Sequence, residues 1–183
     1  MTHRPGSAIR AATVVLGLAA GSLLTIGTTS AAAQTPTFAQ TAPTTTYTKQ
    51  SVTLEAANAA VAAGIAKSRE LGILSTVAVY DEGGTLKALA TMDGARYTGI
   101  QFATDKAWTA ARRLAPTQDL ADSMAAGPEM NWHSFLKQPQ TTLLGGGMPI
   151  VAGGQVAGGI GSSGGTIAQD IEVANAGLAA IQR

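Results

Sequence analysis

Glycine is concentrated in one short stretch of this 183-residue chain, and that stretch limits what can form there. Residues 145–165 hold ten of the chain's 22 glycines. Because glycine has no side chain, such a stretch allows tight turns and a close approach of one backbone to another. Two short strands fit, over residues 148–152 and 155–160, with a tight connection at Gly153 and Gly154.

The rest of the chain supplies helices and a second strand pair. Apolar periodicity and turn residues predict helices over 53–72, about 97–113, 117–125 and 166–181, and strands over 75–80 and 85–91. Thr53, Thr117 and Thr166 are the expected N-caps, and Gln169 completes a capping box with Thr166. Residues 127–141 carry no clear pattern. The order α-β-β-α-α-β-β-α predicts an α+β domain with an antiparallel sheet flanked by helices.

Apolar residues at helical spacing mark one face of the last predicted helix. They are Ile167, Ile171, Ala174, Leu178 and Ile181. We expect this stripe to face the core.

The first 33 residues have the pattern of a secretory signal peptide. Arg4 and Arg10 form a basic region, residues 11–26 are mainly apolar, and residues 30–33 are small. The apolar run is shorter than the roughly 20 residues of a membrane span, although a retained N-terminal anchor is the alternative. We therefore expect a secreted, extracellular protein whose mature form begins near Gln34.

Residues 34–51 are rich in threonine, proline and glutamine and have almost no periodic apolar content. Such a segment buries too little surface to offset its ordering entropy, so we expect a disordered tether. The folded domain is then expected over residues 52–183.

Charge and cysteine content exclude several classes of function. Without residues 1–33 the chain has 12 − 2 = 10 basic and 11 acidic side chains, a net charge of about −1. A near-neutral chain without a basic stripe argues against nucleic acid as a partner. Cysteine is absent, which excludes disulfides, thiol nucleophiles, zinc–thiolate sites and covalent c-type haem attachment.

Four short motifs occur in a fixed order along the chain. They are D-G-A at 93–95, K-A-x-T-A at 106–110, G-G-x-P-I at 146–150 and G-x-S-G-G at 161–165. This order resembles the GlcG/HbpS-like family, whose domain type is shared with the C-terminal part of PduO-type proteins. The resemblance implies a profilin-like fold, a haem or related tetrapyrrole ligand and a homo-oligomer. A membrane sensor protein is considered as a further partner.

His133 is the one histidine outside the predicted signal peptide. A two-histidine metal site within one protomer is therefore impossible. A Ser-His-Asp triad is not favoured either, because residues 161–165 are not expected to form the strained nucleophile elbow that such enzymes use. Histidine is a common axial ligand of haem iron, so His133 is the best candidate for the metal. A surface histidine without a ligand is the alternative.

The resemblance implies that Thr117, in the Ala-Pro-Thr segment after the K-A-x-T-A helix, faces the iron. Its alternative role is the N-cap. Gly164 and Gly165, ahead of a capped helix, could form an anion cradle with unpaired amides, and Lys106 or Arg112 could supply the counter-charge for a propionate. Close packing at the glycines, and surface pairing or helix-dipole roles for the two basic residues, are the alternatives.

The sequence thus favours an exported haem- or tetrapyrrole-binding protein that sequesters haem or assists its sensing, and it does not favour an enzyme. Two alternatives stay open. One is an enzyme that acts on a small acid of the glycolate type, with the glycine loop holding the carboxylate. The other is a ligand-free accessory of a membrane sensor.

Overall fold

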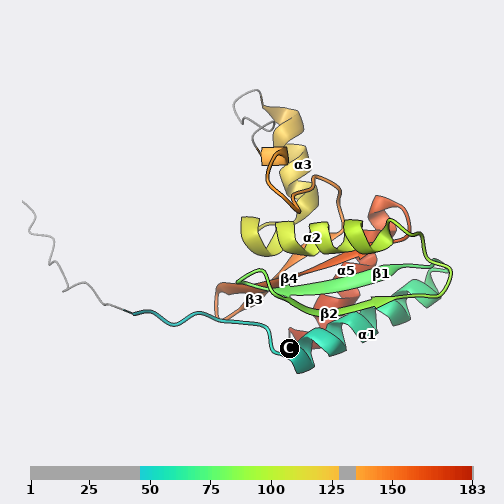
Figure 1. The fold of residues 1–183 in the computed structure, drawn as a ribbon, viewed down its shortest axis with the longest axis horizontal. Helices are drawn as coiled ribbons and strands as arrows, with labels where there is room; N and C mark the ends of the chain where they lie inside the picture. The colour runs from blue at the N-terminus through green and yellow to red at the C-terminus, as the bar shows by residue number, and fades with distance from the viewer. Residues whose placement is uncertain (1–45, 128–134, 183) are drawn as a thin grey trace, which may run out of the picture. The chain divides into compact units, whose positions relative to one another are not determined.

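The computed structural model describes residues 46–127 and 135–182. In this part of the chain, four strands form one antiparallel sheet with the order β2-β1-β4-β3. The elements in chain order are α1 (Leu54–Glu70), β1 (Thr76–Asp81), β2 (Leu86–Thr91), α2 (Gly99–Arg113), α3 (Thr117–Ala126), β3 (Gly147–Ala152), β4 (Gln155–Ser163) and α5 (Ile167–Ile181) (Figure 1).

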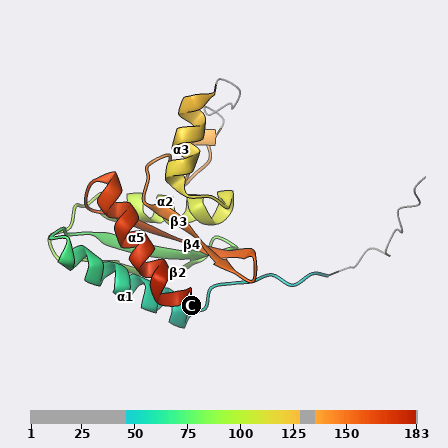
Figure 2. The same cartoon turned by 180° about the vertical axis from the view of Figure 1, so that it is seen from behind.

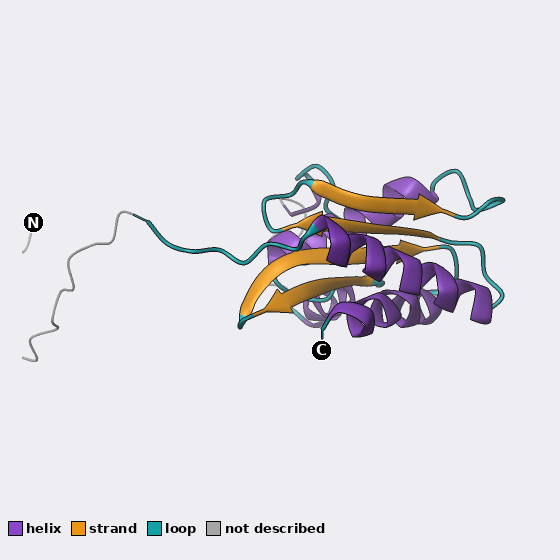
Figure 3. Cartoon of the chain, turned by 90° about the horizontal axis from the view of Figure 1, so that it is seen from below, coloured by secondary structure: helices purple, strands orange, loops and turns teal. Residues whose placement is uncertain are grey.

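Helices cover both faces of the sheet. α2 crosses one face, whereas α1 and α5 pack together on the other (Figures 1 and 2). The view from below shows the long helices running alongside the strands (Figure 3). α3 leads away from the sheet (Figures 1 and 2). The prediction of an α+β domain with an antiparallel sheet flanked by helices is confirmed.

Alternate residues of β4 face the two helical layers, as in any strand. Ile160 meets Gly177 of α5, whereas Gly159 and Gly161 face α2. A Cβ atom on either of these two strand glycines would collide with a backbone carbonyl oxygen of α2. Glycine in β4 therefore allows the helix backbone to rest directly on the strand.

The main core lies between the sheet and the pair formed by α1 and α5. Its larger buried members are Val61, Ile65, Val77, Val79, Ile150, Ile160 and Val173. Full burial of a side chain of this size stabilises the fold by about 1.5–3 kcal/mol. β1 runs through the middle of the sheet, between β2 and β4, and five of its six residues are buried.

Two of the three predicted N-caps are confirmed. The Thr53 hydroxyl accepts a hydrogen bond from the Ala56 amide, and Thr166 forms the predicted capping box with Gln169. The third is wrong, because α3 is preceded by Pro116 and has no side-chain cap, with Thr117 as its first helical residue.

The apolar stripe predicted for α5 is only partly right. The buried residues are Asp170, Val173, Ala174 and Gly177, whereas Ile167 is 47% exposed. α5 approaches its neighbours through small residues, since a Cβ on Gly177 would be 2.8 Å from the carbonyl oxygen of Ala60 in α1. The helix therefore turns a smaller and partly polar face inward.

Two glycine turns occur where the sequence predicts them. Gly84, in the β1–β2 connection, has a φ of 87°, and Gly94 has a φ of 81°. The Asp81 carboxylate also accepts hydrogen bonds from the Gly83 and Thr85 amides. These bonds fix the β1–β2 hairpin connection.

Residues 46–50 have no regular secondary structure and are exposed. The predicted signal peptide and residues 34–45 of the predicted tether lie outside the described residues. No helix in the described part of the chain is long and apolar enough to cross a membrane.

Candidate functional site

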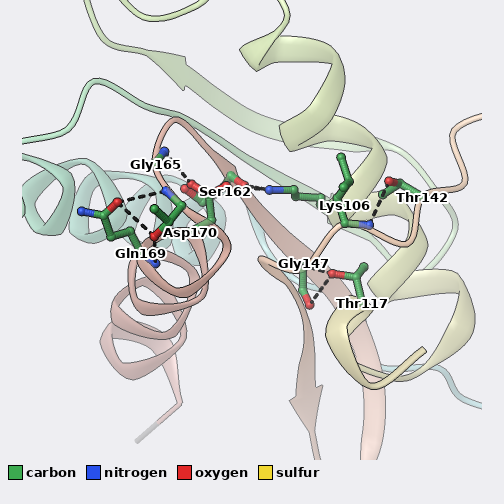
Figure 4. Close-up of polar contacts among 10 residues, drawn as sticks. Lys106, Thr117, Thr142, Gly147, Ser162, Gly165, Gln169 and Asp170 are labelled. Atoms are coloured by element: carbon green, nitrogen blue, oxygen red, sulfur yellow. Dashed lines mark hydrogen bonds and ion pairs between the residues drawn. The ribbon is translucent and has the colours of Figure 1, made fainter. Parts of the chain in front are cut away.

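A buried ion pair links two of the helices. The Lys106 Nζ atom lies 2.7 Å from Asp170 Oδ2 and donates a second hydrogen bond, of 2.8 Å, to the Ser162 carbonyl oxygen (Figure 4). Each of the two charged residues is 3% exposed. Lys106 belongs to α2 and Asp170 to the first turn of α5, so the pair joins the helices on opposite faces of the sheet.

The glycine just before β3 lies against this pair. Gly146 has a φ of 106°, and a Cβ atom there would lie 2.7 Å from the Asp170 Cβ and 3.2 Å from Lys106 Nζ. The Gly146 carbonyl oxygen accepts a hydrogen bond from the Ser162 amide. A larger residue at this position would displace the ion pair.

Burial lowers the pKa of the Lys106 amine below its ordinary value of 10.5, and the attraction and hydrogen bond of Asp170 oppose that shift. The amine is directed at oxygens of its own chain. The alternative of a surface pair on the helix is therefore wrong. The role of this amine as a counter-charge for a propionate stays a prediction, and it would require breaking the pair with Asp170.

Thr117 is fully buried at the start of α3. Its hydroxyl accepts a hydrogen bond of 2.9 Å from the Gly147 amide, and the Gly147 carbonyl oxygen is 3.5 Å away (Figure 4). The hydroxyl thus ties α3 to the first residue of β3. Iron contact by Thr117 stays a prediction, and it would require displacement of this bond.

Within the predicted anion cradle at Gly164 and Gly165, the Gly165 amide is occupied. The Gly165 amide donates to Asp170 Oδ1, and the Thr166 amide donates to Gln169 Oε1. Residues 161–163, predicted as loop, belong to β4. The expectation of unpaired amides is therefore wrong at Gly165, because the Asp170 side chain in the first turn of α5 folds back onto that amide.

Asp170 is the residue of this cluster whose role sequence reasoning missed. It lies 64 positions after Lys106, so no local spacing connects them. The one signal was an acidic residue on the side of α5 that carries Val173 and Ala174. The Oγ atom of Ser162, beside the pair, is buried and has no hydrogen-bond partner among the described residues.

Arg112, in contrast, is exposed near the C-terminal end of α2. Its guanidinium lies 5.6 Å from the centre of the Trp108 ring. It lines a cavity of about 250 Å³, together with Tyr47, Lys49, Glu82, Ala111, Leu114, Gln155 and Val156. The structure thus leaves Arg112 available to a ligand.

Its neighbour Arg113 is occupied within the chain. The Arg113 guanidinium donates to Gln138 and lies 4.3 Å from the centre of the Phe135 ring. It anchors the segment that follows residues 128–134. His133, the proposed iron ligand, lies outside the described residues.

A second cavity of about 370 Å³ lies beside the edge strand β2. Ile65, Ala90 and Met92 give it apolar walls, and Arg69 and Asp93 add charges. No group of three or more metal-binding side chains occurs among the residues that the structure describes.

Comparison with known proteins identifies the family. A family model described as "Haem degrading protein HbpS-like" matches residues 52–179. This chain belongs to the HbpS-like family. The match spans most of the chain and begins within two residues of α1. The family predicted from the four motifs is confirmed.

Other HbpS-like proteins are similar in sequence and fold. Protein GlcG of Escherichia coli K12 is 34% identical over 116 residues, covering 63% of this chain and 84% of GlcG. The crystal structure of HbpS shares 33% identity and superposes with a TM-score of 0.67, covering 74% of this chain and 93% of that one.

One solved relative contains haem. The crystal structure of a PduOC–haem complex shares 27% identity with a TM-score of 0.66, covering 72% of this chain and 95% of that one. The corrinoid adenosyltransferase PduO of Citrobacter freundii is 29% identical over 119 residues, which are 36% of its own length.

Proposed function

We propose that this HbpS-like protein is exported and binds haem or a related tetrapyrrole. Its membership of a family described as haem-degrading is the observation that carries the proposal. A solved relative in complex with haem adds support.

The described residues fit part of what haem requires. Arg112 is exposed and can pair with a propionate, and Leu114 beside it is 65% exposed and offers apolar contact. Their cavity of about 250 Å³ is below the roughly 300–1,000 Å³ of drug-sized ligand pockets. A porphyrin ring would therefore lie on the surface outside the cavity.

His133 is the proposed iron ligand, two positions before Phe135 in the sequence. Bound haem would supply iron for ligand binding or redox chemistry. The chain's own contribution would be to hold the propionates by charge and the ring by apolar contact.

Haemin titration of the secreted protein, followed through the Soret band, tests the proposal. A saturable Soret shift is expected. The time course separates binding from degradation, because a stable band indicates binding and a band that bleaches after addition of a reductant indicates turnover. A spectrum equal to that of free haemin at every protein concentration would overturn the proposal.

Three variants locate the site. Arg112→Ala should raise the haemin Kd by up to about tenfold without moving the Soret band, since a charge-assisted contact is lost away from the iron. His133→Ala should move the band, because an iron ligand is removed. Arg96→Ala, at an exposed position before α2, is the matched control and should leave both unchanged.

Export is tested by N-terminal sequencing of the secreted protein. The sequence should begin near Gln34, after the small residues that signal peptidase favours. A mature form that retains residues 11–26 would contradict export by cleavage.

Homo-oligomerisation and contact with a membrane sensor belong to the same proposal. Exposed apolar side chains at Leu74, Tyr97 and Ile100 support self-association. Light scattering of the purified protein should give a mass above that of one chain. The small-acid enzyme loses part of its support, because the Gly165 and Thr166 amides are occupied by Asp170 and Gln169.

A further inference from the structure

The Arg112 cavity brings charged residues together from parts of the chain that are far apart in sequence. Lys49 comes from the segment before α1, and Glu82 from the β1–β2 turn. Arg112 comes from α2, and Gln155 from the start of β4. The segment before α1 is held in place, because the Val52 amide donates to the Ala157 carbonyl oxygen and the Gln50 amide donates to Gln155 Oε1.

Both signs of charge line this cavity, and among the described residues no ion pair joins them. The Oε2 atom of Glu82 is buried and has no hydrogen-bond partner among the described residues, and within them Glu82 forms no ion pair. A buried carboxylate oxygen requires a donor. Lys49 and Arg112 carry donors for a carboxylate on the same cavity. The walls thus match a ligand with one positive and one negative group.

The remaining wall residues and the volume of the cavity limit the class of ligand further. Ala111, Leu114 and Val156 add an apolar surface. A volume of about 250 Å³ suits a molecule smaller than a drug-sized ligand. We propose that this cavity binds a small amino acid with an apolar side chain, whose ammonium group pairs with Glu82 and whose carboxylate pairs with Arg112 and Lys49. This site goes beyond haem binding and does not depend on it.

Calorimetric titration of the full secreted protein with L-leucine tests the proposal. Two analogues serve as controls, 4-methylpentanoate, which lacks the ammonium group, and 3-methylbutylamine, which lacks the carboxylate. Leucine should bind at least about tenfold more tightly than either, because each analogue leaves one charged wall unpaired. Absence of saturable heat with leucine up to about 10 mM, where millimolar binding is measurable, would overturn the proposal.

Two substitutions test the two ends of the ligand. Glu82→Gln and Arg112→Gln should each weaken leucine binding about tenfold or more. Glu55→Gln and Arg69→Gln, exposed on α1, are the matched controls and should leave it unchanged. The Arg112, Glu55 and Arg69 variants should show unchanged melting curves, since these side chains are exposed. The melting curve of Glu82→Gln verifies that this variant is folded before its leucine affinity is compared. Unchanged leucine affinity in Glu82→Gln would exclude the zwitterion site.

Haemin binding in the same variants separates the two proposals. Arg112→Gln should weaken both ligands. Glu82→Gln should weaken leucine but not haemin, because removing a negative charge cannot reduce the attraction for a propionate. A protein that binds leucine and not haemin would refute the proposed function and leave the amino-acid site intact.

Discussion

Lys106 and Arg112 are two basic residues of one helix with opposite surroundings. Lys106 is 3% exposed and bonded to Asp170 and Ser162, whereas Arg112 is exposed and lines a cavity. Six positions on an α-helix leave two side chains about a third of a turn apart. That rotation turns Lys106 toward β3 and α5, and turns Arg112 toward solvent.

This comparison shows that a residue of a family motif can have a structural role, whereas a residue outside the motif on the same helix is available to bind a ligand. Lys106 belongs to the K-A-x-T-A motif from which the family can be identified. Its amine nevertheless holds the fold together. Arg112 lies outside the motif and keeps its donors available to a ligand.

Removing the positive charge should reveal the largest difference in stability between the Lys106 and Arg112 variants. Lys106→Met should lower the free energy of unfolding by about 3–5 kcal/mol, because Asp170 is left buried without its partner. Arg112→Met should stay within about 0.5 kcal/mol of the wild type. Urea denaturation of both variants measures this.

A double variant sharpens that result. Lys106→Met combined with Asp170→Leu should recover much of the lost stability, since two apolar residues can replace a buried ion pair at little cost. Equal stability losses in Lys106→Met and Arg112→Met would break the contrast between a structural and an available residue.

Substitutions at two glycines with positive φ separate the stability cost of a steric clash from the cost of backbone strain. Gly146→Ala and Gly154→Ala both place a side chain at positive φ, which costs about 1–2 kcal/mol. Only Gly146 also meets the ion pair, whereas a Cβ on Gly154 meets nothing within 4 Å. Thermal melts should therefore show Gly146→Ala as less stable than Gly154→Ala by a further ~1–3 kcal/mol.

Thr117→Val should cost about 1–3 kcal/mol, because the buried Gly147 amide loses its acceptor. Thr117→Ser keeps the hydroxyl and should lose less. Denaturation gives the stability, and haemin titration of the same variants gives the Kd. A Val variant with unchanged stability and a shifted Soret band would instead place the hydroxyl at the iron.

The smallest effect is on proton binding. The Lys106 amine should release its proton below pH 10.5, because burial disfavours its charged form. Between that lower pH and 10.5 the unfolded chain binds more protons, so this group makes the free energy of unfolding rise with pH. NMR titration, with Lys106→Met to assign the signal, measures it. A Lys106 signal that titrates at or above 10.5 would contradict the assignment.

The sequence was a good guide to elements that depend on neighbouring residues. Helices, hairpins and the caps at Thr53 and Thr166 follow from spacing within a few positions. The turn at Gly94 was likewise predictable, because few residues other than glycine adopt a φ of 81° readily.

The same reasoning failed where a side chain meets a distant partner. The Thr117 hydroxyl bonds Gly147, 30 positions away, in place of its own helix. Lys106 finds its carboxylate 64 positions away. Such partners are set by how the layers pack, and the polar residues alone fit a surface site equally well.

The contact of α2 with β4 has a mechanical consequence. At Gly159 and Gly161 no side chain separates helix from strand, so there is no soft layer along which the helix could shear. Shear, the small sliding of packed helices past one another, is one way in which a conformational change spreads through a protein. A ligand bound near the end of α2 therefore lies over a rigid contact between helix and sheet. Any conformational change that the ligand causes has to spread along the protein surface.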